Sequence, residues 1–235
     1  MTWTSAGVMG QRYGRILGLV LPTVSVEIWS DVVCPWCYIG KRRFEKAVEL
    51  LRDEVQFEVV FRPYQLDPTA SPGTSGPVVE AYAKKFGGPE RAEQIIHHVS
   101  SIAAEEGLDF RMDRALRANT LLAHRLLWLA EATGHQYALK ERLLQAYFTD
   151  GLDIGVPEVL AECAADVGMP ADRVLEFLHS DDGLAEVQAE LSVAAEAEIT
   201  AVPTFVIDGK WAIPGAQEPD TFVNVVHRLL ERRNA

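Results

Sequence analysis

Residues 26–44 read VEIWSDVVCPWCYIGKRRF, and this stretch decides the fold. Its first letters, VEIW, are typical of a buried strand, and the polar pair SD that follows ends the strand. After the CPWC motif, apolar residues recur at the spacing of one helix face. The stretch therefore predicts a strand, a Cys-x-x-Cys motif at the turn, and a helix that begins at the motif.

The Cys-x-x-Cys motif at Cys34 and Cys37 is suited to redox chemistry for a structural reason. Cys34 lies where the helix begins, and there the unpaired backbone N–H groups and the helix macrodipole favour a thiolate. Pro35 suits the first helical position, because the N–H that it lacks would have no partner there. Cys37 follows one turn later and can close a disulfide with Cys34. Strand, reactive cysteine and helix in this order predict a thioredoxin-like arrangement.

A zinc site is the alternative use of such a cysteine pair. Structural zinc needs four ligands, usually from a second cysteine pair or a histidine pair. The chain has one further cysteine, Cys163, and no histidine pair at ligand spacing. His97 and His98 are adjacent, so on a helix they point about 100° apart. We therefore expect a redox dithiol and no metal site.

The composition narrows the range of functions. A chain of 235 residues with 48% hydrophobic residues can form one sizeable domain or a domain with a large insertion. The formal net charge of −12 argues against a nucleic-acid partner, because phosphate contacts need Lys and Arg. A local exception is the basic run KRR at residues 41–43. It is either a solvated helix face or a cationic surface that favours the Cys34 thiolate.

The cysteine count and the N-terminal residues indicate the compartment. Three cysteines do not form a disulfide scaffold and suit a reducing environment. The apolar run at residues 16–21 is too short for a secretory signal, and no A-x-A-like cleavage site follows it. No run approaches the roughly 20 apolar residues that cross a bilayer. We therefore expect a cytoplasmic protein without a membrane partner, in which residues 1–22 are an extension.

The rest of the chain alternates between strand and helix patterns. VQFEVVF at residues 55–61 is a second strand, and residues 78–191 carry a series of amphipathic helices. Strand character returns after Pro203, where residues 204–213 predict a hairpin around an Asp-Gly turn. A final amphipathic helix follows.

These elements predict an α/β protein, a thioredoxin fold with a large all-α insertion between the second strand and the strand after Pro203. We expect residues 1–22 to be the extension, residues 23–67 and 195–235 the thioredoxin-like domain, and residues 68–194 the helical insertion domain. The apolar helix stripes suit a core, in which Cys163 is a buried thiol. The same stripes also suit a dimer face, so both a monomer and a homodimer stay open.

Three segments together resemble the DsbA-like thioredoxin-fold proteins of the FrnE type. They are SDVVCPWCYIGKRRFEKA at residues 30–47, AYFTDGLDIG at 146–155 and AVPTFVIDGKWAIPGAQ at 201–217. The resemblance runs from about residue 24 to the last helix. The joint occurrence of the three segments in this order is highly specific. It implies a thioredoxin fold interrupted by a helical domain, with thiol–disulfide oxidoreductase activity.

The resemblance also implies roles for residues outside the dithiol. It implies a cis Val202–Pro203 bond beside the sulfurs, where the Val202 backbone would pair with an extended substrate. Only about 5–6% of X–Pro bonds in folded proteins are cis, and a trans proline that starts a strand is the alternative. The segment ANT…AHR suggests that His124 approaches the active site, and the alternative is a histidine satisfied inside the helical domain. Trp36 either exposes an apolar surface to substrate or packs on the insertion.

Related 2-hydroxychromene-2-carboxylate isomerases and kappa-class glutathione transferases share the architecture, but they typically carry a serine where Cys34 stands. The dithiol therefore favours an oxidoreductase that exchanges protein or small-molecule disulfides. We expect no bound cofactor and a low-molecular-weight thiol, glutathione or an equivalent, as co-substrate. A glutathione-dependent isomerase or transferase is the alternative enzyme, and a binding or chaperone module with an incidental dithiol is the third hypothesis.

Overall fold

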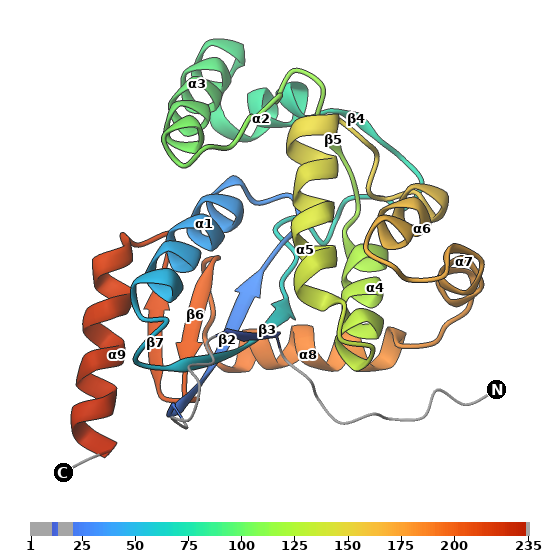
Figure 1. The fold of residues 1–235 in the computed structure, drawn as a ribbon. Helices are drawn as coiled ribbons and strands as arrows, with labels where there is room; N and C mark the ends of the chain where they lie inside the picture. Colours follow the sequence, from blue (N-terminus) through green and yellow to red (C-terminus); the bar gives the residue numbers. More distant parts are fainter. Residues whose placement is uncertain (1–10, 14–20, 234–235) are drawn as a thin grey trace.

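The computed structural model of the chain describes residues 11–13 and 21–233, and its centre is a five-stranded sheet in the order β1-β3-β2-β6-β7 (Figure 1). Strands β2 and β3 are parallel, whereas β1 pairs antiparallel with β3, β6 with β2, and β7 with β6. The strands are β1 (Gln11–Tyr13), β2 (Thr23–Ser30), β3 (Gln56–Pro63), β6 (Thr204–Ile207) and β7 (Trp211–Pro214).

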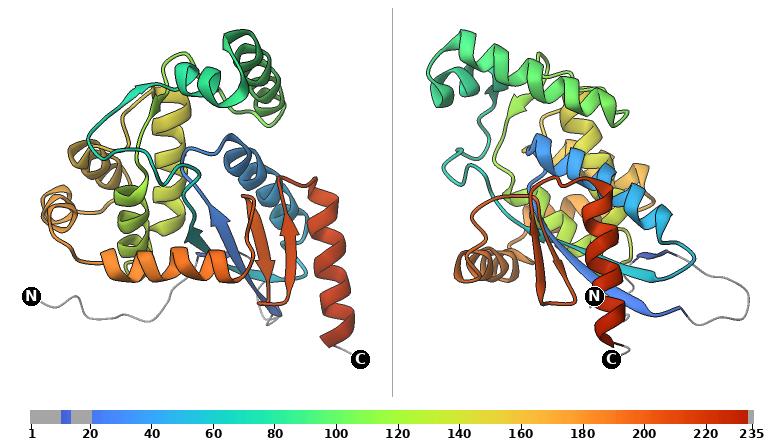
Figure 2. Two further views of the ribbon diagram at one scale, coloured as in Figure 1. Left: turned by 180° about the vertical axis from the view of Figure 1, so that it is seen from behind. Right: turned by 90° about the vertical axis from the view of Figure 1, so that its left-hand side faces the viewer.

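Two helices cover one face of the sheet, as Figure 2 shows from two further directions. Helix α1 (Pro35–Leu50) connects the parallel strands β2 and β3, and α9 (Pro219–Arg233) follows the hairpin. Phe44 of α1 lies at the centre of this core, with ring centroids 5.7 Å from Phe57, 5.5 Å from Phe205 and 5.5 Å from Phe222. Buried aromatic rings at these distances stabilise the layer and fix the position of α1 on the sheet.

The predicted fold class is confirmed: a thioredoxin fold carries a helical insertion between β3 and β6. The insertion is not entirely helical, because a two-stranded ladder of two residues per strand lies within it, too short for any sequence periodicity to indicate. Its elements are β4 (Gly76–Pro77), α2 (Val78–Phe86), α3 (Pro89–Glu105), β5 (Leu116–Arg117), α4 (Leu121–Ala132), α5 (Gln136–Gln145), the π-helix η1 (Ala146–Asp150), α6 (Pro157–Asp166), α7 (Ala171–His179) and α8 (Leu184–Glu196).

The predicted N-terminal extension lies only partly within the described residues. Gln11–Tyr13 form β1, whose register places Tyr13 opposite Phe57. Residues 1–10 and 14–20 lie outside the described residues. Within the part of the chain that the structure describes, no helix combines the length and the apolar character needed to cross a bilayer.

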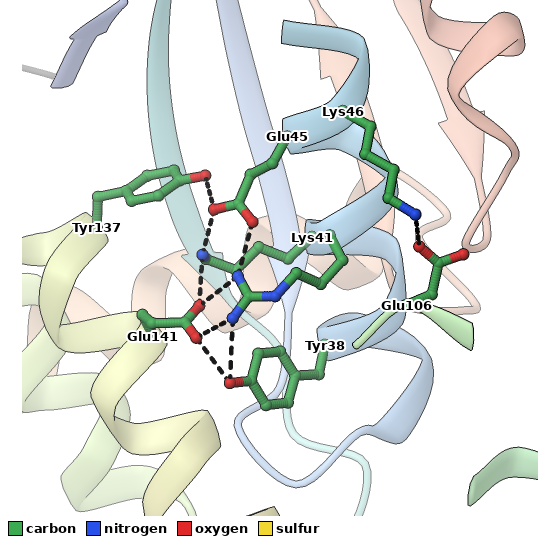
Figure 3. Close-up of polar contacts among 8 residues, drawn as sticks. Tyr38, Lys41, Glu45, Lys46, Glu106, Tyr137 and Glu141 are labelled. Carbon is green, nitrogen blue, oxygen red and sulfur yellow. Dashed lines mark hydrogen bonds and ion pairs between the residues drawn. The ribbon is translucent and has the colours of Figure 1, made fainter. Parts of the chain in front are cut away.

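Helix α5 joins the insertion to the sheet through polar side chains. The Gln136 side chain bonds both backbone groups of Phe61, accepting from its N–H at 2.8 Å and donating to its carbonyl at 2.9 Å. Glu141, further along α5, accepts hydrogen bonds from Tyr38 at 2.7 Å and from Lys41 at 2.6 Å (Figure 3). The insertion is therefore fixed to β3 and to α1, which is the helix that carries the dithiol.

The basic run at residues 41–43 is neither of the two alternatives that the sequence left open. Lys41 is only 2% exposed and is held by Glu45 and Glu141, as Figure 3 shows. Arg43 pairs with Glu106, the C-cap residue that follows α3, at 2.7 Å. The run is therefore neither a solvated face nor a free cationic surface; acidic residues of the insertion pair with it, and sequence alone could not reveal them.

Candidate active site

The two motif cysteines lie at the start of α1, where the chain leaves the sheet. Cys34 is the N-cap residue, with φ −89° and ψ 115°, and Pro35 opens the first helical turn as predicted. The Cys37 N–H donates to the Cys34 carbonyl oxygen at 3.0 Å, which closes the turn between the cysteines. Both thiols are free and only 3% exposed. The local sequence therefore brings two reduced sulfurs together at one helix end.

The two sulfurs face different surroundings. Cys34 faces the segment before β6, where its thiol donates to the Val202 carbonyl oxygen at 3.6 Å, and the Val202–Pro203 bond is cis. Cys37 faces the end of β2 and interacts with the Ser30 side chain and the Asp31 backbone. Cys34 is therefore the outer sulfur, beside a peptide segment, and Cys37 is the inner one.

The hydrogen bond between the two sulfurs and their surroundings shift the two pKa values in opposite directions. The side-chain hydrogen bond with Cys37 holds the pKa of Cys34 well above its usual range, and burial acts in the same direction. The Cys37 backbone N–H at the helix start does favour a Cys34 thiolate, as predicted, but these two larger effects outweigh it. Burial also opposes ionisation of Cys37, but the hydrogen bond from Cys34 and the Lys140 charge outweigh it and lower the pKa of Cys37.

Asp31 and His124 form a buried polar pair behind the motif. Asp31 accepts hydrogen bonds from the backbone N–H groups of Val32 at 2.8 Å and Leu66 at 2.7 Å. The His124 Nε2 atom lies 3.2 Å from Asp31 Oδ1 and 3.0 Å from the Tyr64 carbonyl oxygen. Both of these neighbours are acceptors, so Nε2 carries the proton. His124 thus reaches from α4 to the residue three positions before Cys34, and fixes the loop that carries the motif.

A groove of about 710 Å³ opens beside the dithiol, between α2, the loop before it and η1. Val33 lines it next to Cys34, and the Tyr82 and Tyr147 side chains line it from the insertion. Burial raises the pKa of Tyr82 to about 12, and the nearby Cys34 adds to the shift, so its hydroxyl keeps its proton. Neither tyrosine hydroxyl bonds to another described residue, so both can donate to a bound molecule. The groove can therefore hold a small molecule or an extended peptide.

The remaining predicted residues lie around the outer sulfur or apart from the site. Trp36 is 38% exposed, so of its two alternatives the structure shows the exposed one. Pro203 is buried against α1, and Cys163 is buried in the insertion core on α6. Among the described residues, no group of three or more His, Cys, Asp or Glu side chains is arranged to hold a metal ion.

Gly40 is a positioning residue that the sequence analysis missed. It lies on α1 opposite the segment 201–204, and a Cβ there would lie 2.9 Å from Pro203 Cγ and 3.3 Å from Ala216 Cα. These contacts are too short, because a proline ring and a backbone atom cannot turn aside. Only glycine therefore lets α1 approach Pro203 closely enough for the Cys34 contact with Val202.

Gly40→Ala is expected to lower the free energy of unfolding by about 1–2 kcal/mol, because overpacking a tight core is destabilising. An ordinary exposed helix position would instead gain about 1 kcal/mol from the same change. Urea unfolding measures the effect. Gly76→Ala is the matched control, because a Cβ at Gly76 meets no atom within 4 Å. A stabilised Gly40→Ala variant would show that α1 and the Pro203 segment are not in close contact.

Comparison with known proteins agrees with this geometry. Residues 25–227 match the model of DSBA-like thioredoxin domains. A probable DsbA oxidoreductase from Streptomyces coelicolor is 36% identical, with a TM-score of 0.81 over 87% of this chain and 89% of that chain. The cytosolic disulfide reductase DsbM from Pseudomonas aeruginosa is 18% identical, with a TM-score of 0.62 over 88% and 98%. A 2-hydroxychromene-2-carboxylate isomerase is 14% identical, with a TM-score of 0.61 over 89% and 98%. These last two similarities concern the fold alone.

Proposed function

The chain belongs to the family of DSBA-like thioredoxin domains, and from this premise we propose that it is a thiol–disulfide oxidoreductase that works through Cys34 and Cys37. One observation carries the proposal. The outer sulfur contacts the Val202 carbonyl oxygen and shares a hydrogen bond with the inner sulfur, and Val33, the residue before Cys34, lines the groove. An attacking thiol needs access to substrate, and a resolving thiol needs access only to its neighbour.

The first step of the proposed cycle forms a mixed disulfide. The Cys34 proton passes to the Cys37 thiolate through the hydrogen bond between them. The Cys34 sulfur then attacks one sulfur of the substrate disulfide, a new S–S bond forms, and the substrate bond breaks. The second substrate sulfur leaves with the electron pair. In the second step Cys37 attacks Cys34, and the reduced substrate is released as the Cys34–Cys37 disulfide forms. Two electrons pass from the dithiol to the substrate.

The groove supports both protein and small-molecule disulfides as substrates. An extended peptide can lie beside Val202, and Trp36 offers it an apolar surface next to the outer sulfur. A low-molecular-weight thiol or its disulfide fits the 710 Å³ groove, where Tyr82, Tyr147 and the cations Lys84 and Lys85 supply hydrogen-bond donors. These donors favour a co-substrate that carries carbonyl and carboxylate groups.

We place this activity in the cytoplasm. A chain with three cysteines, two of them in the motif, has no disulfide scaffold, which suits a reducing compartment. DsbM, which shares the fold, is described as a cytosolic disulfide reductase. The isomerase that shares the fold supplies the competing hypothesis, a reaction that uses the groove without the dithiol.

Insulin reduction with dithiothreitol as the electron donor tests the proposal. The wild type is expected to accelerate insulin precipitation, Cys34→Ser to proceed at the uncatalysed rate, and Cys163→Ser to match the wild type. Equal rates for the wild type and Cys34→Ser would overturn the redox function. Turnover of 2-hydroxychromene-2-carboxylate with glutathione by Cys34→Ser would favour the isomerase instead.

A further inference from the structure

Lys140 is a buried lysine that the disulfide-exchange cycle leaves without a role. It lies on α5 of the insertion, its side chain is 0% exposed, and its ammonium nitrogen has no hydrogen-bonding partner among the described residues. It lies 5.4 Å from the centroid of the Phe61 ring, a cation–π contact that offsets only part of the cost of burying an ammonium group. A completely buried amine without a hydrogen-bonding partner is unfavourable for folding, and a buried titratable group of this kind is a candidate for a functional role.

Charged and titratable groups from several elements surround this amine. Those that interact with it through their charge are Cys34, Cys37, Asp31 and Lys41. A small cavity of about 10 Å³ adjoins it, the size that accommodates one water molecule. The cavity is lined from β2, β3, α4, α5 and α8, and its polar lining residues are Ser30, Arg62, His124, Glu131, Gln136 and Glu190. The amine therefore interacts with the inner sulfur through its charge, and it lines a cavity that the half-buried Glu131 and Glu190 also line.

The other polar groups near the dithiol are already engaged. Both Asp31 carboxylate oxygens accept hydrogen bonds from backbone N–H groups. The His124 Nε2 proton is directed at Asp31 and at a backbone carbonyl oxygen. Glu141, the residue after Lys140 on α5, is held by three donors from α1, Tyr38, Lys41 and Arg42. Within the part of the chain that the structure describes, Lys140 is therefore the base beside Cys37 that is free to exchange a proton.

We propose that Lys140 takes the proton of Cys37 in the second step of disulfide exchange and returns it to solvent through the adjoining cavity. The proposal rests on the proposed function and deepens it, because it names the group that makes the buried resolving thiol reactive. Burial lowers the pKa of Lys140 to about 8, so the amine and ammonium forms both occur near neutral pH.

The proton and the electron pair of the Cys37 thiol separate in this step. After the first step, Cys37 carries the proton that came from Cys34. The neutral Lys140 amine accepts this proton, and the Cys37 sulfur keeps the electron pair. That sulfur attacks Cys34, the Cys34–Cys37 bond forms, and the bond between Cys34 and the substrate sulfur breaks. The substrate leaves as a thiolate and takes a proton from solvent, and the Lys140 ammonium then releases its own.

Lys140→Met tests the proposal, because it removes the amine and keeps the length of the side chain. Lys210→Met, in the exposed turn between β6 and β7, is the matched control. The first measurement is the thiolate absorbance of the reduced protein against pH, with the Cys34→Ser/Cys37→Ser double variant as the blank. The second is the rate at which a preformed mixed disulfide between Cys34 and a small chromophoric thiol releases that thiol, from pH 6 to 9.

Lys140→Met is expected to move the thiolate midpoint upward by about one pH unit, which is a tenfold loss of thiolate on its acid side. Release of the small thiol at pH 7 is expected to slow at least about tenfold. A midpoint and a release rate that match those of the wild type and Lys210→Met would overturn the proposal. A merely structural role would slow release without moving the midpoint, and would also overturn it. If the wild type reduces no disulfide, the proposed function fails, and the thiolate titration still tests Lys140.

Discussion

Cys37→Ser is expected to form a lasting mixed disulfide with substrate and to lose multiple turnover by about 10³-fold or more. The outer sulfur, beside Val202, can still attack a substrate disulfide, but no inner sulfur remains to release it. With an aromatic disulfide such as DTNB, the wild type should release two coloured thiols per chain. Cys37→Ser should release one and keep the other on Cys34, which mass spectrometry of the intact protein detects as an adduct.

Two further variants make this result specific. Cys34→Ser should react slowly with DTNB, because the sulfur that remains at the site is directed inward toward Ser30 and Asp31. Cys37→Ser/Cys163→Ser should still carry one adduct, since Cys163 is buried in the insertion core. A stable adduct on Cys37 in Cys34→Ser, formed as fast as the adduct on Cys34, would mean that the roles of the two sulfurs are reversed.

The parts of the site that are local in the chain could be predicted from the sequence. A strand, a polar break, the cysteine pair and Pro35 occupy consecutive positions, and each has a short-range physical signature in β2 and α1. The hairpin that follows Pro203 was predicted for the same reason. The contact between Val202 and Cys34 was implied by the family resemblance and could not be predicted from the spacing of residues in the sequence.

The electrostatics of the dithiol could not be predicted, because burial of the sulfurs, the hydrogen bond between them and the Lys140 charge all depend on the folded structure. Lys140 lies in QYALKERLLQ, where the charged run KER is typical of a solvated helix face. Only the docking of α5 on the sheet, through Gln136 and Phe61, turns that position inward. The Lys140 charge acts on Cys37, which lies 103 positions before it in the chain, so no local pattern around the motif could indicate this interaction.

Helix α5 thus places two adjacent charged residues against the thioredoxin-like domain, and only one of them is hydrogen-bonded there. Glu141 has three donors, Tyr38, Lys41 and Arg42, while Lys140 has no hydrogen-bonding partner within the described part of the chain. Removal of a paired buried charge is destabilising, because its partners are left buried and unpaired. A buried charge that has no partner is itself destabilising. If Lys140 serves catalysis, the protein tolerates a loss of stability at that position.

Lys140→Met and Glu141→Gln are therefore expected to change stability in opposite directions. Burial lowers the pKa of Lys140 from its ordinary 10.5 to about 8, a penalty on the order of 3 kcal/mol at pH 7 that Lys140→Met should remove. Glu141→Gln should lose about 2 kcal/mol, because Lys41 then remains buried with Glu45 as its only carboxylate among the described residues. Urea unfolding of the oxidised protein measures both changes. Cys34 and Cys37, whose charges raise the pKa of Lys140, carry no charge in that state, so the Lys140 penalty is no smaller there.

The pH dependence distinguishes a charge effect from a packing effect at Lys140. Between the folded pKa of about 8 and the unfolded value of 10.5, the unfolded chain binds the extra proton, so wild-type stability rises with pH through this window. Lys140→Met has no such titration, and its advantage over the wild type should shrink from pH 7 to about pH 9.5. Lys210→Met, which changes an exposed lysine, should stay within about 0.5 kcal/mol of the wild type throughout. A stability difference between Lys140→Met and the wild type that stays constant with pH would assign the effect to methionine packing. A Lys140→Met variant that is less stable than the wild type at pH 7 would show that the buried amine is well solvated.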